Sequence, residues 1–444
     1  MILTRIDVRG RPQRDLAGIL PRPDEPGRDV RGQVAAIIER VRTGGDRALF
    51  ELGEELDGVT LDTLRVSGTD ISAALGRIPG ALRDALETAH ANIEAYHAFE
   101  PSPPGEYERD GVRVRHLVRP VQRAGCYAPG GRARYPSTVL MCAVPARVAG
   151  VEEVVLCVPP DRSGHVDDAT LAAAAIAGVD EVYALGGAHA IAAMAYGTET
   201  IAPVDVIVGP GNLYVAEAKR QVSGAVGVAA AFAGPSEVVV VAGPDTPARY
   251  AAIDLAVQAE HGPDGLAWLL TWSEEQADAV DEELSRIAAA SPRRSDLEST
   301  LKAGGYACLV DDVAQAIAVS NVVAPEHLEL LFDGAEALLG DVRAAGAVFC
   351  GPYAPASLGD YVAGPNHVLP TNRTARFASA LRTDDFRRHI HAVSVERAAL
   401  ELLGPSVETL AATEGLPAHA ASIEVRRTQA AVGGAPGAPG AVPR

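Results

Sequence analysis

The stretch VEEVVLCVPPDRSGHVDDATLAAAAIAGVDEVYALGG, residues 151–187, decides the expected fold. Short apolar runs at 151–158 and 181–187 are typical of strands that are buried on both faces of a sheet. The Ala-rich segment 169–178 lies between them and has the composition of a helix. Because a helix joins the two strands, the stretch predicts a βαβ unit with parallel strands.

The same alternation continues toward the C-terminus. Helices are expected at 188–197 and 212–222, on either side of a strand at 204–211. A second series follows, with strands separated by helices such as 274–290 and 335–346; its strands are expected at 236–243, 266–272, 306–310 and 347–351. We therefore predict an α/β protein with two Rossmann-like parallel-sheet units and small helical N- and C-terminal domains.

The remaining segments set the expected domain boundaries. Helical periodicity covers 30–58 and 81–99 and returns near 379–414, whereas 351–374 has no periodicity and is interpreted as a functional loop. The expected parts are an N-terminal arm at 1–25, a first α/β domain at 26–120 plus 237–378 carrying the metal and catalytic residues, a second α/β domain at 121–236 on the cofactor side, a C-terminal helical domain at 379–430 and a disordered tail at 431–444.

The composition favours an ordinary globular chain. It has 444 residues, 48% hydrophobic and 22% charged, with a formal net charge of −19. No Lys/Arg-rich run suggests a nucleic-acid partner, and no apolar run approaches the roughly 18 residues of a membrane span. The start, MILTRIDVRG, lacks the apolar core of a signal peptide. The five scattered cysteines include no C-x-x-C pair, so we predict reduced thiols and a cytoplasmic location.

A carboxylate and an imidazole stand side by side in APEHLELL, residues 324–331. Pro325 disfavours the helical conformation for Ala324 and favours an extended one. The apolar residues that follow predict a strand, so Glu326 and His327 are expected at its mouth, where functional side chains often lie. The alternative is a solvated acid beside a surface histidine.

Three other places gather side chains that could do chemistry. In QAEHG, Gln258 and His261 are three residues apart and would share a helix face. The other two places supply an acid and a histidine each: Asp360 and His367, and Glu414 and His419. One site that gathers all four places is more plausible than four unrelated groups of polar residues. Its nitrogen and oxygen groups suit Zn²⁺ or another divalent metal, and a metallohydrolase fits at this point.

Signals for a nucleotide are weaker. No G-x-G-x-x-G follows the first expected strand. The segment VGPGN, residues 208–212, lies between a strand and a helix, where backbone N–H groups can meet an anion. A second Gly-rich turn, YAPGGR, covers 127–132. Both stretches are equally compatible with tight connections between strand and helix.

Taken together, these stretches resemble the histidinol dehydrogenase family to about residue 427. The resembling segments occur in the family's order and spacing: YAPGGRARYPSTVLMCAVPARVAGV, VGPGNLYVAEAKRQV, AGPSEVVVVA, QAEHG, APEHLELL, SLGDYVAGPNHVLPT and EGLPAH. The resemblance implies a zinc- and NAD-dependent oxidoreductase of histidine biosynthesis. Such an enzyme oxidises L-histidinol through L-histidinaldehyde to L-histidine, reducing two NAD⁺.

The resemblance also assigns roles to residues. It implies one zinc ion per subunit, with the ligands Gln258, His261, Asp360 and His419. It implies that Glu326 activates water and that His327 accepts the alcohol proton. Substrate contacts are implied for Ser236, His327, His367, Glu414 and the four metal ligands, and NAD contacts for Tyr127, His189 and Asn212. The family is a homodimer, so Glu414 and His419 would act in the partner's site.

Some positions depart from the family pattern. His189 stands where Gln is usual at a cofactor contact, AAAF precedes AGPSE where an Asp is usual, and Val323 stands where Tyr is common. No metal or catalytic position is changed. Relatives on this scaffold that oxidise other alcohols, including sulfonated diols, remain an alternative, as does a metal-binding protein or metallohydrolase without redox chemistry. The presence of His367 and Glu414 favours an amino alcohol that carries an imidazole.

Overall fold

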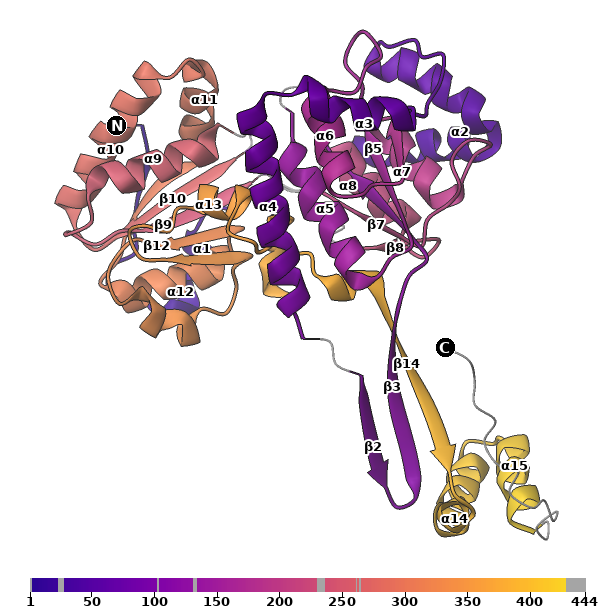
Figure 1. Cartoon of the computed structure of the whole chain (residues 1–444). Helices are drawn as coiled ribbons and strands as arrows, with labels where there is room; N and C mark the ends of the chain where they lie inside the picture. The colour runs from indigo at the N-terminus through magenta and orange to yellow at the C-terminus, as the bar shows by residue number, and fades with distance from the viewer. Residues whose placement is uncertain are drawn as a thin grey trace. The chain divides into compact units, whose positions relative to one another are not determined.

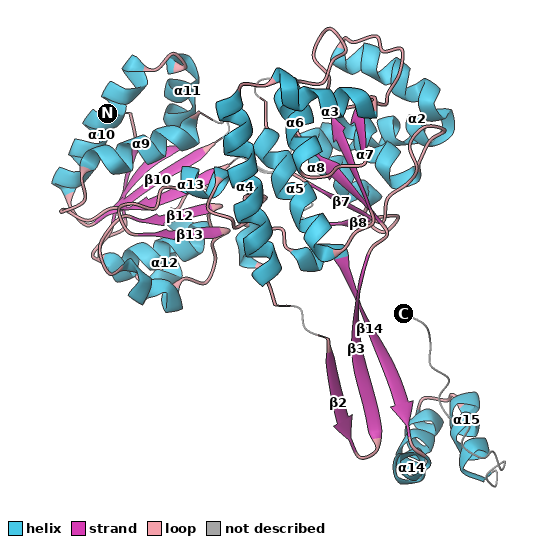
Figure 2. Ribbon diagram, viewed as in Figure 1, coloured by secondary structure: helices cyan, strands magenta, loops and turns pink. Residues whose placement is uncertain are grey.

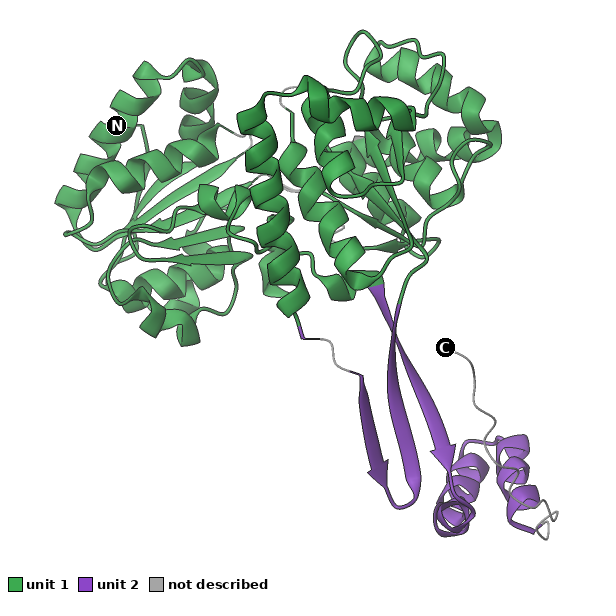
Figure 3. Cartoon of the chain, viewed as in Figure 1, with its two compact units in different colours: residues 1–100, 120–386 green, residues 101–119, 387–444 purple. Residues whose placement is uncertain are grey.

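The computed structural model describes residues 2–22, 28–101, 104–130, 134–229, 236–260, 262 and 265–428 (Figure 1). The chain divides into two compact units (Figure 3). The first unit comprises residues 1–100 and 120–386, and the second comprises residues 101–119 and 387–444. The expected tail at 431–444 and the histidine at position 261 lie outside the described residues.

The first unit contains a six-stranded parallel sheet. Its strands follow the order β1 (Thr4–Asp7), β11 (Gly305–Leu309), β10 (Leu266–Thr271), β9 (Glu237–Val241), β12 (His327–Leu330) and β13 (Ala347–Cys350). One face is covered by α9 (Ala248–Ala259), α10 (Glu274–Ala290) and α11 (Arg294–Gly304), and the other by α1 (Gln13–Ile19) and α12 (Val313–Val323) (Figure 2). Burial on both faces explains the unbroken valines of β9.

A second parallel sheet lies in the same unit. Its order is β6 (Glu181–Ala184), β5 (Glu153–Val158), β4 (Arg123–Tyr127), β7 (Val206–Val208) and β8 (Gly227–Val228). The helices that connect its strands are α5 (Pro136–Ala149), α6 (Asp168–Ile176), α7 (Gly187–Tyr196) and α8 (Leu213–Val222). The predicted class, α/β with two Rossmann-like sheets, is thus confirmed. The chain runs outward from β4 through β5 to β6 and then crosses to β7, so the order reverses between β4 and β7.

The helices between residues 28 and 99 complete the layers around this second sheet. They are α2 (Arg28–Leu52), a π-helix (Gly53–Asp57), α3 (Gly68–Arg77) and α4 (Gly80–Phe99). Helix α2 packs with α7 and α8 on one face, and α3 and α4 pack with α5 and α6 on the other. The helical periodicity of this region therefore marks the faces that bury apolar side chains in the cores of the sheet.

The expectation of helix near 379–414 is wrong over its first part. A 3₁₀ turn (Thr383–Phe386) is followed by β14 (Arg387–Val395), and α14 (Arg397–Thr413) and α15 (Pro417–Thr428) come only afterward. Strand β14 joins a sheet with a hairpin of β2 (Gly105–Arg109) and β3 (Val112–Pro120). This pairing, made with a segment far away in the sequence, supplies the backbone partners of RRHIHAVSV and overrides its mixed local pattern.

Two further segments differ from expectation. The aperiodic segment 351–374 contains a helix, α13 (Ala356–Tyr361), which is too short to leave a periodic signal. The helix expected at 335–346 is instead a 3₁₀ helix at Ala335–Asp341. Over the described residues, no helix has both the length and the apolarity needed to cross a bilayer.

Candidate active site

The Glu326–His327 pair stands where the chain enters β12. Helix α12 ends at Val323 and is capped by Ala324, which adopts φ 52° and ψ 59° while its N–H donates to Ser320 O at 2.7 Å. The extended conformation predicted for Ala324 is therefore wrong, because the left-handed helix cap outweighs the restriction from Pro325. Glu326 is 8% exposed and His327 5% exposed. This burial contradicts the alternative of a solvated acid beside a surface histidine.

Glu326 is held by the start of the neighbouring strand, β9. Its Oε2 accepts a hydrogen bond from the Ser236 hydroxyl and another, of 3.2 Å, from the Glu237 backbone N–H. Strands β9 and β12 are parallel neighbours, with His327 in register with Val238. The pair therefore lies at the amino-terminal edge of the six-stranded sheet, beside the point where its strand order reverses between β9 and β12.

Gln258 reaches the same place from the last turn of α9. Its Oε1 lies 3.3 Å from Ser236 Oγ, and its Nε2 is buried without a hydrogen-bond partner among the described residues. The Ser236 hydroxyl has one proton, which it donates to Glu326, so it cannot also serve Gln258 Oε1. Rotating the amide lets Nε2 donate to Ser236 and turns Oε1 to the unpartnered side. That arrangement leaves an amide oxygen available to a ligand.

His327 lies between two carboxylates. Its Nε2 is 3.4 Å from Asp360 Oδ1, and its Nδ1 is 3.8 Å from Glu326 Oε2. Burial alone would lower the pKa of His327, but the charges of Glu326 and Asp360 outweigh it and the net shift is upward. The ring is thus placed to carry a proton between its neighbours and a bound molecule.

His367 approaches from the loop after α13. Its Nδ1 is 2.6 Å from the backbone oxygen of Asp360, and its Nε2 is 3.4 Å from Thr138 Oγ1 on α5. The loop is anchored beside it, because the Asn366 side chain donates to Met141 O at 2.6 Å. Burial lowers the pKa of His367, which favours the neutral ring. With Nδ1–H donating to the carbonyl, Nε2 remains the acceptor.

The structure thus places six of the expected residues in one connected chain of contacts within the first unit: Ser236, Gln258, Glu326, His327, Asp360 and His367. Two others belong to the second unit, where Glu414 closes α14 and His419 lies on α15, both exposed. Among the described residues, which exclude His261, no group of three His, Cys, Asp or Glu side chains could hold a metal ion.

The residues expected at a cofactor gather at the carboxyl ends of the other sheet. Tyr127 ends β4, and its hydroxyl accepts a 3.1 Å hydrogen bond from Gly187 N at the start of α7. Asn212 follows β7 and caps α8 through a 3.1 Å bond from Val215 N. These two loops flank the reversal of strand order between β4 and β7, which is where nucleotides bind in open parallel sheets.

Two features of this edge are specific. Gly209 has φ 105°, and a Cβ there would lie 2.0 Å from Tyr127 O, so only glycine allows the two loops to approach. His189 is buried, with Nε2 3.4 Å from Asp57 Oδ2 at the end of the π-helix. The imidazole that replaces the usual amide is therefore accompanied by a carboxylate.

Comparison with known proteins assigns the family. The family model described as histidinol dehydrogenase matches residues 20–427. The chain belongs to the histidinol dehydrogenase family. It is 46% identical over 402 residues to the histidinol dehydrogenase of Parasynechococcus marenigrum strain WH8102, covering 90% of this chain and 91% of the relative. It is 45% identical over 420 residues to that of Gluconobacter oxydans strain 621H, covering 93% and 96%.

A solved structure agrees with this assignment. The crystal structure of histidinol dehydrogenase from Elizabethkingia anophelis superposes with a TM-score of 0.91 at 35% identity, covering 96% of this chain and 98% of that one. The predicted membership of this family is therefore confirmed, and the protein is an oxidoreductase of the histidinol dehydrogenase family.

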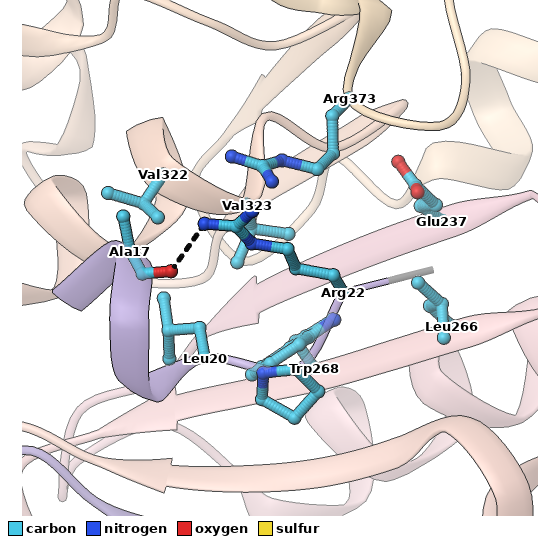
Figure 4. Close-up of a pocket in the computed structure, with 10 residues that line it drawn as sticks. Ala17, Leu20, Arg22, Glu237, Leu266, Trp268, Val322, Val323 and Arg373 are labelled. Atoms are coloured by element: carbon cyan, nitrogen blue, oxygen red, sulfur yellow. Dashed lines mark hydrogen bonds between the residues drawn. The ribbon is translucent and has the colours of Figure 1, made fainter. Parts of the chain in front are cut away.

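The sequence pattern did not identify Glu237, a buried acid that lies beside the candidate active site of this histidinol dehydrogenase family member. Glu237 heads β9 with 0% exposure, and burial, together with the charge of Glu326, raises its pKa to about 8. It lines a cavity of about 10 Å³ together with Arg22 and Arg373 (Figure 4). That volume holds roughly one water molecule. The available signal was a glutamate directly before four consecutive valines.

Proposed function

We propose that this protein is an NAD- and zinc-dependent histidinol dehydrogenase, which oxidises L-histidinol through L-histidinaldehyde to L-histidine. The carrying observation is the buried Glu326–His327 pair, with Glu326 held by Ser236 and His327 beside Asp360. Two oxidations at one carbon require two kinds of proton handling. A carboxylate and an imidazole that share one site can supply both.

In the first oxidation, His327 Nε2 accepts the hydroxyl proton of the substrate while hydride leaves the carbon. The carboxylates of Glu326 and Asp360 stabilise the imidazolium that forms. In the second, the Glu326 carboxylate takes a proton from the water that adds to the aldehyde, while the His327 imidazolium gives its proton to the carbonyl oxygen, so that the diol forms and His327 is neutral again. His327 then accepts a hydroxyl proton of the resulting diol as the second hydride leaves. Ser236 keeps the carboxylate of Glu326 directed at the water.

We assign a zinc ion to Gln258, His261, Asp360 and His419. The donor set supports this assignment, since an amide oxygen, a carboxylate and imidazoles are oxygen and nitrogen ligands that a divalent ion accepts. The unpartnered amide end of Gln258 and the carboxylate of Asp360 fit such a role. These residues would hold the ion, which would supply a positive charge that attracts the amino and imidazole nitrogens of the substrate and so would help to orient its alcohol carbon.

We assign NAD to the edge flanked by Tyr127 and Asn212, with His189 nearby. The strand-order reversal between β4 and β7 supports this placement. The chain contributes the backbone conformation of this edge. Gly209 allows the loop after β7 to approach the end of β4, and the amino end of α8 lies at the same edge. Backbone N–H groups at that helix end favour a bound pyrophosphate.

We extend the proposal to a homodimer in which Glu414 and His419 of the partner subunit complete each site. Exposed apolar side chains on the second unit support a partner surface; they include Ile390, Val393, Val395, Leu402 and Leu410, each at least 46% exposed. In that dimer His367, Ser236 and Glu414 would contact the substrate. We also propose a cytoplasmic location, which five free thiols support.

The decisive test uses Glu326→Gln in two assays with purified protein. The first follows NADH formation from histidinaldehyde, and the second follows NADH consumption as histidinaldehyde is reduced to histidinol. We expect the first rate to fall about 10²- to 10⁴-fold, the usual value of a general base, and the second much less. The exposed Glu336→Gln should leave both rates unchanged. Equal losses in the two assays, or no NADH from histidinol with wild-type protein, would overturn the proposal.

A further inference from the structure

Two acids that the proposed chemistry does not use face each other inside the first unit. Asp254 lies on α9 and Glu329 on β12, and they are 9% and 1% exposed. Their carboxyl groups lie within hydrogen-bonding reach of each other. No nitrogen or hydroxyl of the described residues donates to Glu329 Oε2. A hydrogen bond between two carboxyl groups requires that one of them carry a proton.

The surroundings keep that proton in place. Burial, followed by the charge of Asp254, raises the pKa of Glu329 well above its usual range, and burial also raises the pKa of Asp254. Two buried carboxyl groups in contact cannot both ionise at low cost. The pair therefore carries a single negative charge and one shared proton, which joins α9 to β12.

The pair also reaches the helix that carries Asp360. Glu329 Oε1 accepts a 2.7 Å hydrogen bond from the backbone N–H of Ala356, the first residue of α13. Asp360 follows four residues later on that helix, and Gln258 follows Asp254 by four residues on α9. Two of the expected metal ligands, Gln258 and Asp360, thus each lie one turn from a contact of the pair. Glu329 itself is two residues beyond His327 on β12.

We propose that Asp254 and Glu329 are positioning residues that fix Gln258 and Asp360 relative to each other through one proton-sharing contact between α9, β12 and α13. This inference rests on the proposed function, since it assumes that Gln258 and Asp360 bind zinc. Groups that orient metal ligands in this way typically change metal affinity by about 10- to 100-fold when removed. The pair would act before any substrate arrives.

The test measures zinc affinity by competition with a chromogenic chelator, in the full-length protein. Asp254→Ala removes one partner, and we expect zinc affinity to fall about 10- to 100-fold. Asp254→Asn keeps the contact, because its amide N–H can donate to the Glu329 carboxylate, and it should stay within about threefold of wild type. Rescue by the amide separates positioning through this contact from a need for a carboxylate at position 254.

A second variant removes the other contact of Glu329. Ala356→Pro deletes the donated N–H at the first position of a helix, where proline is well accepted. The loss of one hydrogen bond should weaken zinc binding about 2- to 10-fold. If Asp254→Ala does not fold, this variant carries the test alone. Asp281→Ala is the matched control, because this buried acid instead accepts from Ile2 N and Leu3 N and should alter stability but not zinc affinity.

Amide hydrogen exchange provides a readout that is independent of the metal. Exchange at the amides of α13 should accelerate in Asp254→Ala and Ala356→Pro and stay as in wild type in Asp254→Asn and Asp281→Ala. Wild-type zinc affinity in both contact-breaking variants would overturn the inference. Failure of wild type to bind zinc would overturn the proposed metal site instead. In that case unchanged exchange in α13 would overturn the positioning role as well.

Discussion

Glu237 makes the stability of this protein depend on pH in a way that one substitution should remove. The side chain is fully buried, and its pKa is raised from 4.5 to about 8. Because the folded state holds this proton more tightly than the unfolded chain, the stability that Glu237 contributes is complete below about pH 4.5. It is lost progressively as pH rises through about 8.

The size of the effect follows from the shift. One pKa unit corresponds to about 1.4 kcal/mol, so about 2.5 units are lost by pH 7, or roughly 3 kcal/mol. The uncharged amide in Glu237→Gln avoids this loss. The variant should therefore be more stable than wild type by about 3 kcal/mol at pH 7, by less than about 1 kcal/mol at pH 5, and by about 5 kcal/mol at pH 9.

The assay is equilibrium urea unfolding at these three values of pH, followed by tryptophan fluorescence. Trp268 is a suitable probe because it is buried on β10, in register with Val239 of β9. The exposed Glu282→Gln should change the free energy of unfolding by less than about 0.5 kcal/mol at every pH. A stabilisation by Glu237→Gln that does not grow with pH, or a destabilisation at pH 9, would refute the reasoning.

Two further predictions test the cofactor edge and the metal. Gly209→Ala should lower the free energy of unfolding by about 3 kcal/mol or more, because its Cβ would lie 2.0 Å from Tyr127 O. Gly224→Ala, at the same φ of 105° but with no neighbour within 4 Å, should lower it by only about 1–2 kcal/mol. Equal losses of the two variants in urea unfolding would contradict this steric account. After dialysis, His261→Ala should retain less than about a tenth of a zinc ion per subunit, compared with about one in wild type, as measured by atomic absorption. The control His165→Ala, which changes an exposed histidine, should keep its zinc. A His261→Ala protein that stays fully loaded with zinc would remove this ligand from the proposal.

The sheets were predictable because their strands are continuous apolar runs. Val238–Val241 could hardly be anything but a buried strand, and the structure places it at the centre of the larger sheet. Strand β14 was not predictable in the same way, since its partner β3 lies far earlier in the sequence. The Asp110–Gly111 dipeptide, with φ 52° and 76°, did carry a hairpin signal.

The motifs named the residues that the structure gathers at the candidate site, but not the buried acids next to them. Glu326 follows Pro325 at the mouth of a predicted strand, and Asp360 stands in an aperiodic segment rich in Gly and Pro; an acid in either place is a candidate functional group on the sequence pattern alone. Glu237, Asp254 and Glu329 occur within regular strands and helices, where an acid ordinarily faces water. Only the packing of distant elements shows that these three are buried, so local patterns could not distinguish them from surface acids.

The two sheets are built from differently spaced parts of the chain, and this difference affects the order in which they can form during synthesis. The five-stranded sheet comes from one continuous stretch between Arg123 and Val228, whereas the larger sheet pairs Thr4–Asp7 with Gly305–Leu309. On the ribosome, the half expected to hold the cofactor can assemble as soon as it emerges. The first strand must wait until Gly305–Leu309 has been made, so the sheet that carries the candidate active site can be completed only after the other one.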